Sequence, residues 1–379
     1  MHVTLYLRHF PAAGAPLVGG TSIAVDGLAS GLSASGAQVT VVCEGGERSS
    51  VKTNAGYRIE GFPMRGRYHT FEIGPELKRY AAEQLAPKQG LCLVNGMFHP
   101  GAYAMARLLH SVGVPYVAAP HDPYDRAVFR RNPHLKWPYW YLFERRLLKR
   151  ARAIQVLDIK HAECLRSIGI DTPVIETPNG VSPGCVPAES QLRWRSPEEP
   201  ARIMFLGRID AYNKGLDMLV DAFAHISGQA DARLTVQGPD WGDRARLARR
   251  AAARGLADKV AFRGPDYERS APQIIGEHDI FCLPSRFEGF GLAALEAMLA
   301  GRVLLVSEIS GIARHVRAGG CGVVVRPTSH GIRAGLDTLL KRRAEWREMG
   351  LSGRRYALAN LQWKKIAAEA LEQYARLVA

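Results

Sequence analysis

The sequence has no long hydrophobic run and no paired cysteines. No apolar stretch in its 379 residues approaches the roughly 18–20 residues that a membrane-spanning helix needs. Its start, MHVTLYLRHF, lacks a basic region followed by a long apolar core, so it predicts a first strand and not a signal peptide. The six cysteines are scattered without a CxxC pair. That pattern argues against a disulfide framework or a zinc site and is typical of a cytoplasmic protein.

Recognisable nucleic-acid-binding motifs are also missing, although the net charge is +14. A charge of this size favours anionic partners, which include nucleic acid, anionic membrane and anionic small molecules. The basic residues are dispersed along the chain and do not form a tail. We therefore expect no nucleic-acid partner, and a steep salt dependence of binding to random duplex DNA would contradict this expectation.

One segment, Arg126 to Arg152, combines dense positive charge with aromatic side chains. Its indole and phenol rings belong to Trp137, Tyr139, Trp140 and Tyr141. This composition is typical of a surface for anionic lipid headgroups, which would place the protein peripherally at the inner face of the cell membrane. An ordinary amphipathic helix pair is the interpretation that we favour slightly, because Leu142, Leu147 and Leu148 look like core positions.

Short strand patterns alternate with helical patterns in both halves of the chain. In the first half the strands are VTLYL, QVTVVCE, GLCLVNG, VPYVAAP and AIQVLD, and after the proline-rich TPNGVSPGCVPAES they are ARIMFLGR, RLTVQG, KVAFRG, DIFCLPS and RVLLVSE. This alternation predicts an α/β fold of two doubly wound Rossmann-like domains. We place them at residues 1–185 and 186–360, followed by a helix at 361–379. Ligands of such sheets bind beyond the carboxyl ends of the strands, so a cleft between the domains is the expected site.

The stretch PSRFEGFGLAALEAMLAG follows one of these buried strands and begins a helix. Its glycines, Gly289 and Gly291, let the backbone come close to a ligand. The N–H groups of Phe290, Gly291 and Leu292 lie at the positive end of the helix dipole, which favours an anion.

Two carboxylates, Glu288 and Glu296, belong to the same stretch. A carboxylate repels a phosphate but accepts hydrogen bonds from neutral hydroxyl groups such as those of a ribose or a sugar ring. A site for a diphosphate between two acceptors for hydroxyls suits a nucleotide sugar. A plain helix N-terminus with turn glycines and a solvated glutamate is the alternative that a shorter fragment would favour.

The stretch FLGRIDAYNKGLD supplies positive charge at the end of another strand. Gly207 and Arg208 follow the strand, and Lys214 precedes a helix. Two cations at this position can neutralise a diphosphate without a metal. An arginine and a lysine in a loop are usually solvated surface, and only their expected place beside the cleft favours a functional role.

Taken together, the chain resembles the retaining glycosyltransferases of family four, which have the GT-B fold and use nucleotide-diphosphate sugars. The matching stretches are GGTSIAVDGLASGLSASGAQVTVV, VPYVAAPHDPYD, PNGV, GRIDAYNKGLDMLVDAF and EGFGLAALEAMLAG, and the segment YLFERRLLKRARAIQVLDIKHAECLRSIGI is similar to bacterial members that build surface polysaccharides. The resemblance implies an N-terminal acceptor-binding domain facing a C-terminal donor-binding domain across a cleft. It also implies that the last helix returns to the first domain.

The resemblance implies roles for individual residues. Arg208 and Lys214 would bind the diphosphate and stabilise the departing charge, with Gly207 beside them. Glu288 would hold hydroxyls of the donor sugar, and Glu296 would bind the ribose. The backbone of the EGFGL turn would bind the phosphates or the sugar through Gly289, Phe290, Gly291 and Leu292.

Further roles fall outside these two stretches. Gly20 would let the backbone approach the phosphate or the anomeric centre, and His121 would stand next to the transferred sugar. Arg263 and Asp266 would flank the base. A lone histidine is more often structural than catalytic, and the functional interpretation of His121 rests on its place in the family.

The implied reaction retains the anomeric configuration. No pair of carboxylates suited to a double displacement is evident, so the expected mechanism is a front-face reaction in which the departing diphosphate helps to take the acceptor proton. A DxD motif is absent, so we expect neither a metal nor a cofactor. The expected substrates are a UDP-sugar and a glycan or lipid-linked acceptor. The alternative is a sugar-nucleotide-processing enzyme such as an epimerase, against which the Glu288–Glu296 signature speaks.

Overall fold

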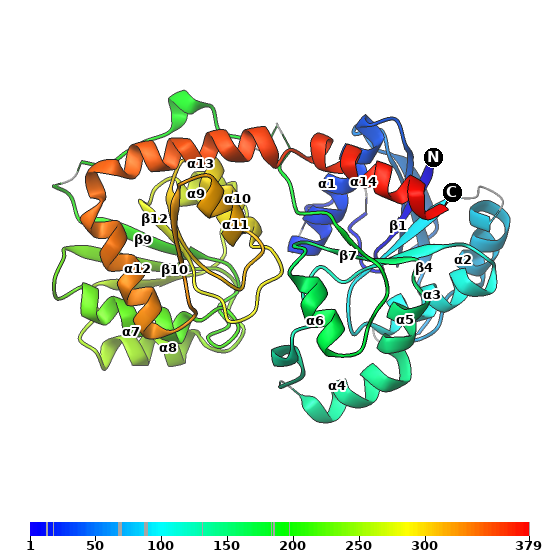
Figure 1. Cartoon of the computed structure of the whole chain (residues 1–379), viewed down its shortest axis with the longest axis horizontal. Coiled ribbons are helices and arrows are strands. Elements are labelled where there is room, and N and C mark those ends of the chain that lie inside the picture. The colour runs from blue at the N-terminus through cyan, green and yellow to red at the C-terminus, as the bar shows by residue number, and fades with distance from the viewer. Residues whose placement is uncertain are drawn as a thin grey trace. The chain divides into compact units, whose positions relative to one another are not determined.

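The computed structural model describes residues 1–12, 14–17, 19–66, 70–86, 90–130, 132–182, 184, 186–196 and 198–378. The chain divides into two compact units. Unit 1 comprises Met1–Gly180 and Trp363–Ala379, and unit 2 comprises Val181–Gln362. Each unit is built around its own sheet (Figure 1). Cys185 lies outside the described residues; of the other cysteines, Cys164 is partly buried and the rest are buried.

Unit 1 contains an eight-stranded sheet with the order β3-β4-β2-β1-β5-β6-β7-β8. All neighbouring strands are parallel except β3 and β4, which form an antiparallel pair at one edge. The strands are β1 (His2–Tyr6), β2 (Gln38–Gly45), β3 (Ser49–Lys52), β4 (Arg58–Pro63), β5 (Leu91–Asn95), β6 (Tyr116–Ala119), β7 (Ala153–Val156) and β8 (Val174–Glu176). The strand order reverses between β1 and β5, as in a doubly wound sheet.

The helices of unit 1 include the last helix of the chain. They are α1 (Gly20–Ala34), α2 (Pro75–Tyr80) continued by η1 (Ala81–Leu85), α3 (Pro100–Ser111), η3 (Arg126–Arg130), α4 (Pro133–Tyr139), η4 (Trp140–Glu144), α5 (Arg145–Arg150), α6 (His161–Ser167) and α14 (Trp363–Val378). Helix α14 packs on α1, where Gly27 and Gly31 allow the close approach. A Cβ atom at Gly27 would clash with the indole of Trp363, so the pairing requires a glycine there.

Unit 2 contains a six-stranded sheet whose strands are all parallel, with the order β11-β10-β9-β12-β13-β14. The strands are β9 (Ala201–Leu206), β10 (Ala232–Gln237), β11 (Val260–Arg263), β12 (Ile280–Leu283), β13 (Val303–Ser307) and β14 (Gly322–Val325). The strand order reverses between β9 and β12, which is the point where ligands of doubly wound sheets bind. Strands β12 and β13 are buried along their whole length, as the centre of a parallel sheet requires.

The helices of unit 2 form two groups. They are α7 (Leu216–Ile226), α8 (Arg244–Ala252), α9 (Ala271–Ile275), α10 (Leu292–Leu299), α11 (Ala313–Ala318), α12 (Ser329–Lys341) and α13 (Trp346–Asn360), with the short 3-10 helices η6 (Glu189–Gln191) and η7 (Arg343–Glu345). In one group α7 packs between α8 and α12, and in the other α10 packs between α9 and α13. The predicted pair of doubly wound α/β sheets is therefore confirmed.

Several details differ from the prediction. Strands β3, β4, β8 and β14 were not predicted: β3 is exposed, β8 and β14 are only partly buried, and the pattern of β4 is interrupted by Glu60 and Gly61. The last helix begins at Trp363 and not at residue 361. The prediction that Leu142 lies in the core is wrong, because its side chain is 52% exposed, whereas Leu147 and Leu148 are buried.

Candidate active site

Two loops of unit 2 meet at the carboxyl ends of β9 and β12. Lys214, from the loop after β9, places its Nζ atom 2.7 Å from Oε2 of Glu288, from the loop after β12. The Oγ atom of Ser285 donates a second hydrogen bond to the same carboxylate oxygen, at 3.2 Å. Both members of the ion pair are largely shielded from solvent. The structure thus brings together two predicted site residues at the switch point of the sheet.

The close approach of the two loops depends on Gly215, which precedes α7. Its φ of +67° lies in the left-handed region, and a Cβ atom there would clash with the carbonyl oxygen of Pro284. The backbone also joins the loops, since the N–H of Arg286 donates to the carbonyl of Asn213 at 2.9 Å. These contacts hold the residues on both sides of Lys214 against the segment that leads to Glu288.

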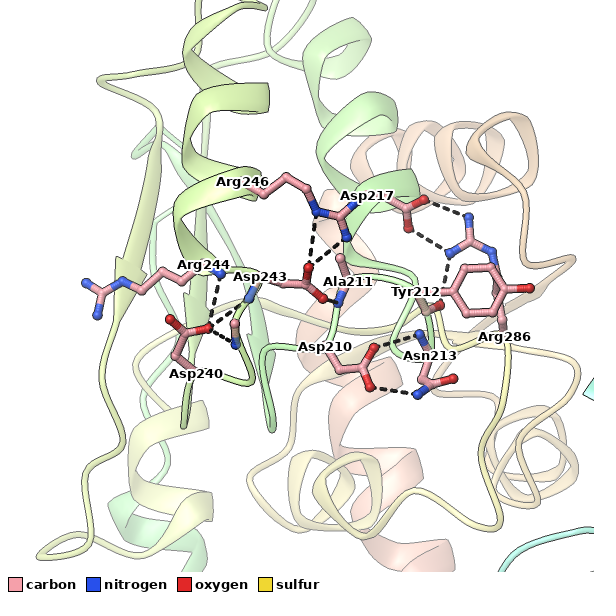
Figure 2. Close-up of polar contacts among 11 residues, drawn as sticks. Asp210, Ala211, Tyr212, Asn213, Asp217, Asp240, Asp243, Arg244, Arg246 and Arg286 are labelled. Carbon is pink, nitrogen blue, oxygen red and sulfur yellow. Dashed lines mark hydrogen bonds and ion pairs between the residues drawn. The ribbon is translucent and has the colours of Figure 1, made fainter. Parts of the chain in front are cut away.

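A set of polar contacts holds the loop after β9 in shape (Figure 2). The carboxylate of Asp210 accepts hydrogen bonds from the backbone N–H of Asn213 at 3.0 Å and from its Nδ2 at 2.6 Å. Arg286 forms a bidentate ion pair with Asp217 at 2.7 and 2.8 Å, and it also donates to the carbonyl of Tyr212. The loop that carries Lys214 is therefore pinned at both ends before any ligand arrives.

Arg208 is exposed and lies over an aromatic ring. Its guanidinium carbon is 4.3 Å from the centroid of Trp241, which lies in the loop after β10. That loop is itself attached to the loop after β9, because Asp243 accepts the backbone N–H of Ala211 at 2.8 Å (Figure 2) and Trp241 donates its backbone N–H to Ile209. Stacking on an indole orients a guanidinium while leaving its N–H groups available to an anion.

The N-terminus of α10 begins directly after the loop of Glu288. Gly291 caps the helix with a φ of +101°, in the left-handed region, and the helix starts at Leu292. Within the part of the chain that the structure describes, no hydrogen-bond acceptor faces the backbone N–H groups of Phe290, Gly291 and Leu292. Free N–H donors at the positive end of a helix dipole favour an anion, and they follow the loop that carries Glu288.

Glu296 lies in the second turn of α10 and is partly buried. Burial raises the pKa of its carboxyl group from 4.5 to about 7. Among the described residues no side chain forms a hydrogen bond or ion pair with this carboxylate. A desolvated carboxylate without a partner is poised to accept hydrogen bonds from the hydroxyl groups of a ligand.

Two of the predicted site residues, Gly20 and His121, belong to unit 1. His121 follows β6 with a φ of +67°, which is rare for a residue with a side chain, and its Nε2 lies 2.7 Å from Oδ1 of Asn95 at the end of β5. Burial lowers the pKa of His121 to about 4, so the ring is neutral at physiological pH. Gly20 is the exposed first residue of α1.

The two residues expected beside the base lie at and after the carboxyl end of β11. Arg263 is the last residue of this strand and is exposed. Asp266 pairs with Arg269 at 2.8 Å and also accepts the N–H groups of Glu268 and Arg269, and these contacts lower the pKa of its carboxyl group. The partners of Asp266 are thus local and do not include the Lys214–Glu288 pair.

Some residues that shape the site were not predicted. Ser285 and Arg286 lie inside the PSRFEGFG stretch, but only the structure shows that they bind Glu288 and Asp217. Trp241 and Asn95 gave no local signal, because each reaches its partner from a distant segment of the chain. Among the described residues no group of three or more histidine, cysteine, aspartate or glutamate side chains could hold a metal ion, and no helix is long and apolar enough to cross a membrane.

Comparison with known families identifies the chain. Residues 18–184 match the family described as Glycosyltransferase Family 4, and residues 188–356 match the glycosyl transferases group 1 family. The chain belongs to glycosyltransferase family four. The family predicted from the EGFGLAALEAMLAG block is therefore confirmed.

Curated relatives match the family-four chain over part of their length. A D-inositol 3-phosphate glycosyltransferase of Nocardia farcinica is 34% identical over 187 residues, which is 47% of this chain and 41% of the relative. A phosphatidyl-myo-inositol mannosyltransferase of Mycobacterium leprae is 27% identical over 223 residues, covering 58% of each protein. The chain thus spans less than two thirds of the length of these relatives.

Solved structures match over nearly the whole chain. The sucrose-phosphate synthase of Thermosynechococcus elongatus has a TM-score of 0.78 at 20% identity and covers 99% of this chain, which covers 98% of that one. Anabaena HepE in complex with UDP-glucose has a TM-score of 0.70 at 16% identity, with 99% of this chain and 100% of that chain covered. At these identities the likeness shows the fold, which is GT-B.

Proposed function

We propose that this protein transfers a sugar from a nucleotide-diphosphate sugar to an acceptor hydroxyl with retention of configuration. The observation that carries the proposal is the ion pair between Lys214 and Glu288 at the β9–β12 switch point. The pair places a cation for phosphate and a carboxylate for sugar hydroxyls 2.7 Å apart. A transferase that breaks a bond between a sugar and a diphosphate needs this combination at the reacting centre.

The diphosphate occupies the positive part of the site in this proposal. Arg208, oriented by Trp241, and Lys214 bind its oxygens, and the N–H groups of Phe290, Gly291 and Leu292 complete the anion site. Charge develops on the diphosphate as the bond to the sugar breaks, and preorganised donors stabilise it without a metal. The departing oxygen then accepts the proton of the attacking hydroxyl.

The neutral parts of the donor contact the two carboxylates. Glu288, already held by Lys214 and Ser285, accepts hydroxyls of the transferred sugar. Glu296, desolvated and without a side-chain partner among the described residues, accepts the ribose hydroxyls. The roles of Gly20, His121, Arg263 and Asp266 remain predictions.

We further propose that the donor base is uracil and that the acceptor is a glycan or lipid-linked sugar. Anabaena HepE, which shares the fold, was solved with UDP-glucose, and this supports a UDP-sugar. The M. leprae relative is a phosphatidyl-myo-inositol mannosyltransferase, and this supports an acceptor that carries a lipid.

Contact with an anionic membrane surface belongs to the same proposal. In the Arg126–Arg152 segment the side chains of Leu135 and Tyr141 are each 61% exposed, although an amphipathic helix pair would turn such residues inward. The only acidic residue of the segment, Glu144, is fully buried. Exposed basic side chains, Arg146 among them, belong to the same segment. Exposed apolar and basic side chains in one segment suit a bilayer with anionic headgroups.

The proposal is tested first by thermal shift with UDP, GDP, ADP and their common sugar conjugates, each with and without EDTA. A rise in melting temperature with one base, unchanged by EDTA, is the expected result. An effect that EDTA removes would contradict the metal-independent mechanism. The absence of any shift would contradict the phosphate site at α10.

The transfer product separates this proposal from the alternative of an epimerase. With a bound donor, a transferase forms a glycosylated acceptor and a nucleoside diphosphate in equal amounts. Release of free nucleotide without any acceptor product, across a panel of glycan and lipid-linked acceptors, would favour the epimerase instead. The stereochemistry of the product, measured by NMR, tests retention.

A further inference from the structure

A pocket lies at the amino ends of the strands of the unit 2 sheet, opposite the candidate active site at their carboxyl ends. Its volume is about 170 Å³, and it is formed where the chain enters β9, β12 and β13. Asp279 precedes β12, Arg302 precedes β13, and Arg343 and Arg347 come from η7 and α13. The catalytic loops follow the carboxyl ends of the same strands, so the two places are separated by the length of the sheet.

Positive charge dominates the walls of this pocket. Four arginines line it, Arg195, Arg302, Arg343 and Arg347, against the single carboxylate of Asp279. Arg195 is also paired with Glu199. The charges therefore leave an excess of two positive units around a space of about 170 Å³. Like charges gathered around one space repel one another unless an anion lies among them.

Hydrogen-bond donors without partners concentrate in the same walls. Arg302 is only 2% exposed; its Nε and one terminal nitrogen donate to the carbonyls of Ala300 and His278, and its other terminal nitrogen has no acceptor. The indole Nε1 of Trp194 and the Nε of Arg195 are likewise buried without an acceptor in the described structure. Buried donors are nearly always satisfied, so three unsatisfied ones on residues that line one pocket point to an absent acceptor.

The indole of Trp194 is within cation–π distance of two guanidinium groups. The guanidinium carbon of Arg347 is 4.9 Å from its ring centroid, and that of Arg302 is 5.7 Å away. No hydrogen bond or ion pair engages Arg347 within the described part of the chain, and its side chain is exposed, so it is available to a ligand. Burial lowers the pKa of Arg302 to about 10, which leaves the side chain charged at neutral pH.

We propose that this pocket is a second anion site, which binds the phosphoryl group of inorganic phosphate or of a small phosphate monoester. A guanidinium group can donate two parallel hydrogen bonds to the oxygens of a phosphoryl group. The volume of 170 Å³ is below the roughly 300 Å³ at which pockets for larger ligands begin, so a whole nucleotide does not fit. The proposal concerns residues that the donor site does not use and does not depend on the proposed function.

Isothermal titration calorimetry of the whole chain with inorganic phosphate, at constant ionic strength in chloride, tests the site. Arg347→Gln should weaken binding about 10-fold, because it removes one charged donor. Trp194→Phe should weaken it less and keeps the aromatic ring. The matched control is Arg355→Gln, which changes an exposed arginine of the same helix that pairs with Glu348 outside the pocket.

The candidate active site also attracts phosphate, and Arg208→Ala separates the two. If phosphate binding survives in Arg208→Ala and adding Arg347→Gln to that variant weakens it about 10-fold, the second site is established. Equal affinity of Arg208→Ala with and without Arg347→Gln, no binding in the wild type, or loss of all binding in Arg208→Ala would overturn it. Titration with a hexose phosphate distinguishes the sources: tighter binding than inorganic phosphate assigns a monoester, and weaker binding assigns the free ion.

Discussion

Lys214 and Glu288 are 74 residues apart in the chain, yet Nζ and Oε2 lie 2.7 Å from each other at the junction of two strands. The pair fixes the position of both groups. Glu288 holds the ammonium group of Lys214 in place, and Lys214 offsets the negative charge of the Glu288 carboxylate. Loss of either partner leaves the other unpaired in a largely shielded position.

Substitution of either partner should therefore abolish most of the transfer activity. We expect Lys214→Met and Glu288→Gln each to lower kcat about 100- to 1,000-fold, as removal of one preorganised group at a reacting centre does. The double variant should lose little more, because the two residues act as a unit. Lys341→Met, which breaks an exposed pair with Asp337, is the control. An active Glu288→Gln enzyme would contradict the assignment.

The pKa of Glu296 predicts a pH-dependent stability. The folded protein holds a proton until pH about 7, whereas the unfolded chain releases it near 4.5. The contribution of Glu296 is therefore fully present below pH about 4.5 and is lost as the pH rises through about 7. Relative to Glu296→Gln, the wild type should lose melting temperature across this window in scans without ligand. A constant difference between the two proteins would show that the carboxyl group is not desolvated.

The affinity for nucleotide should depend on the ionisation of Glu296 in the opposite direction from the stability. The charged form of Glu296 accepts two hydroxyl hydrogens, so the affinity for UDP should increase as the pH rises through about 7. In Glu296→Gln this increase should disappear. Glu348→Gln, an exposed substitution on α13, serves as the control and should retain it.

The stacking of Arg208 on Trp241 predicts a measurable contribution to donor binding. Trp241→Ala should raise the KM for the donor about two- to five-fold, since a cation–π contact at an exposed site contributes about 0.5–1 kcal/mol. Trp241→Phe should keep most of the wild-type value. Tyr267→Ala, which removes another exposed aromatic ring of unit 2, should leave KM unchanged. An unaltered KM in Trp241→Ala would mean that the indole does not orient Arg208.

The backbone of His121 is left-handed, so alanine and glycine variants can distinguish a structural role of this residue from a chemical one. Both His121→Ala and His121→Gly should lose transfer activity if the imidazole contacts the donor. His121→Gly should be more stable than His121→Ala by about 1 kcal/mol in urea unfolding, because only glycine adopts a φ of +67° without strain. Full activity in the glycine variant would restrict His121 to a structural role beside Asn95.

Membrane contact predicts salt-sensitive co-sedimentation with anionic vesicles. Replacing Arg146 and Lys149 with glutamine should weaken binding at low salt about 25-fold, at about 1 kcal/mol per charge near the surface. Leu142→Glu should also release the protein. The matched control replaces Lys364 and Lys365, which are exposed on α14. Equal sedimentation of the charge variant and the control would contradict the proposal.

Sequence patterns could predict the sheets but not the contacts between loops. Strands such as β12 are continuous apolar runs, so the alternation of strands and helices was visible, and the EGFGLAALEAMLAG block identified the family. Strand β3 is exposed throughout, and no hydrophobic pattern marks it. Leu142 belongs to an apolar run, and only its position on the outer side of η4 shows that it is exposed.

The same limit applies to the site. Lys214 and Glu288 were both predicted, yet their direct ion pair depends on Gly215 fitting against Pro284, and neither residue is near the other in sequence. The lowered pKa of His121 and the raised pKa of Glu296 come from burial by distant elements. Such effects are tertiary and leave no local pattern.

The packing of α14 on α1 has a consequence for the order of synthesis. Unit 1 contains Met1–Gly180 and the final helix, so the ribosome makes all of Val181–Gln362 before α14 emerges. Until then the face of α1 at Gly27 and Gly31 is uncovered. A nascent or truncated chain that ends before Trp363 would therefore present an unfinished first unit beside a second one that already has all of its strands.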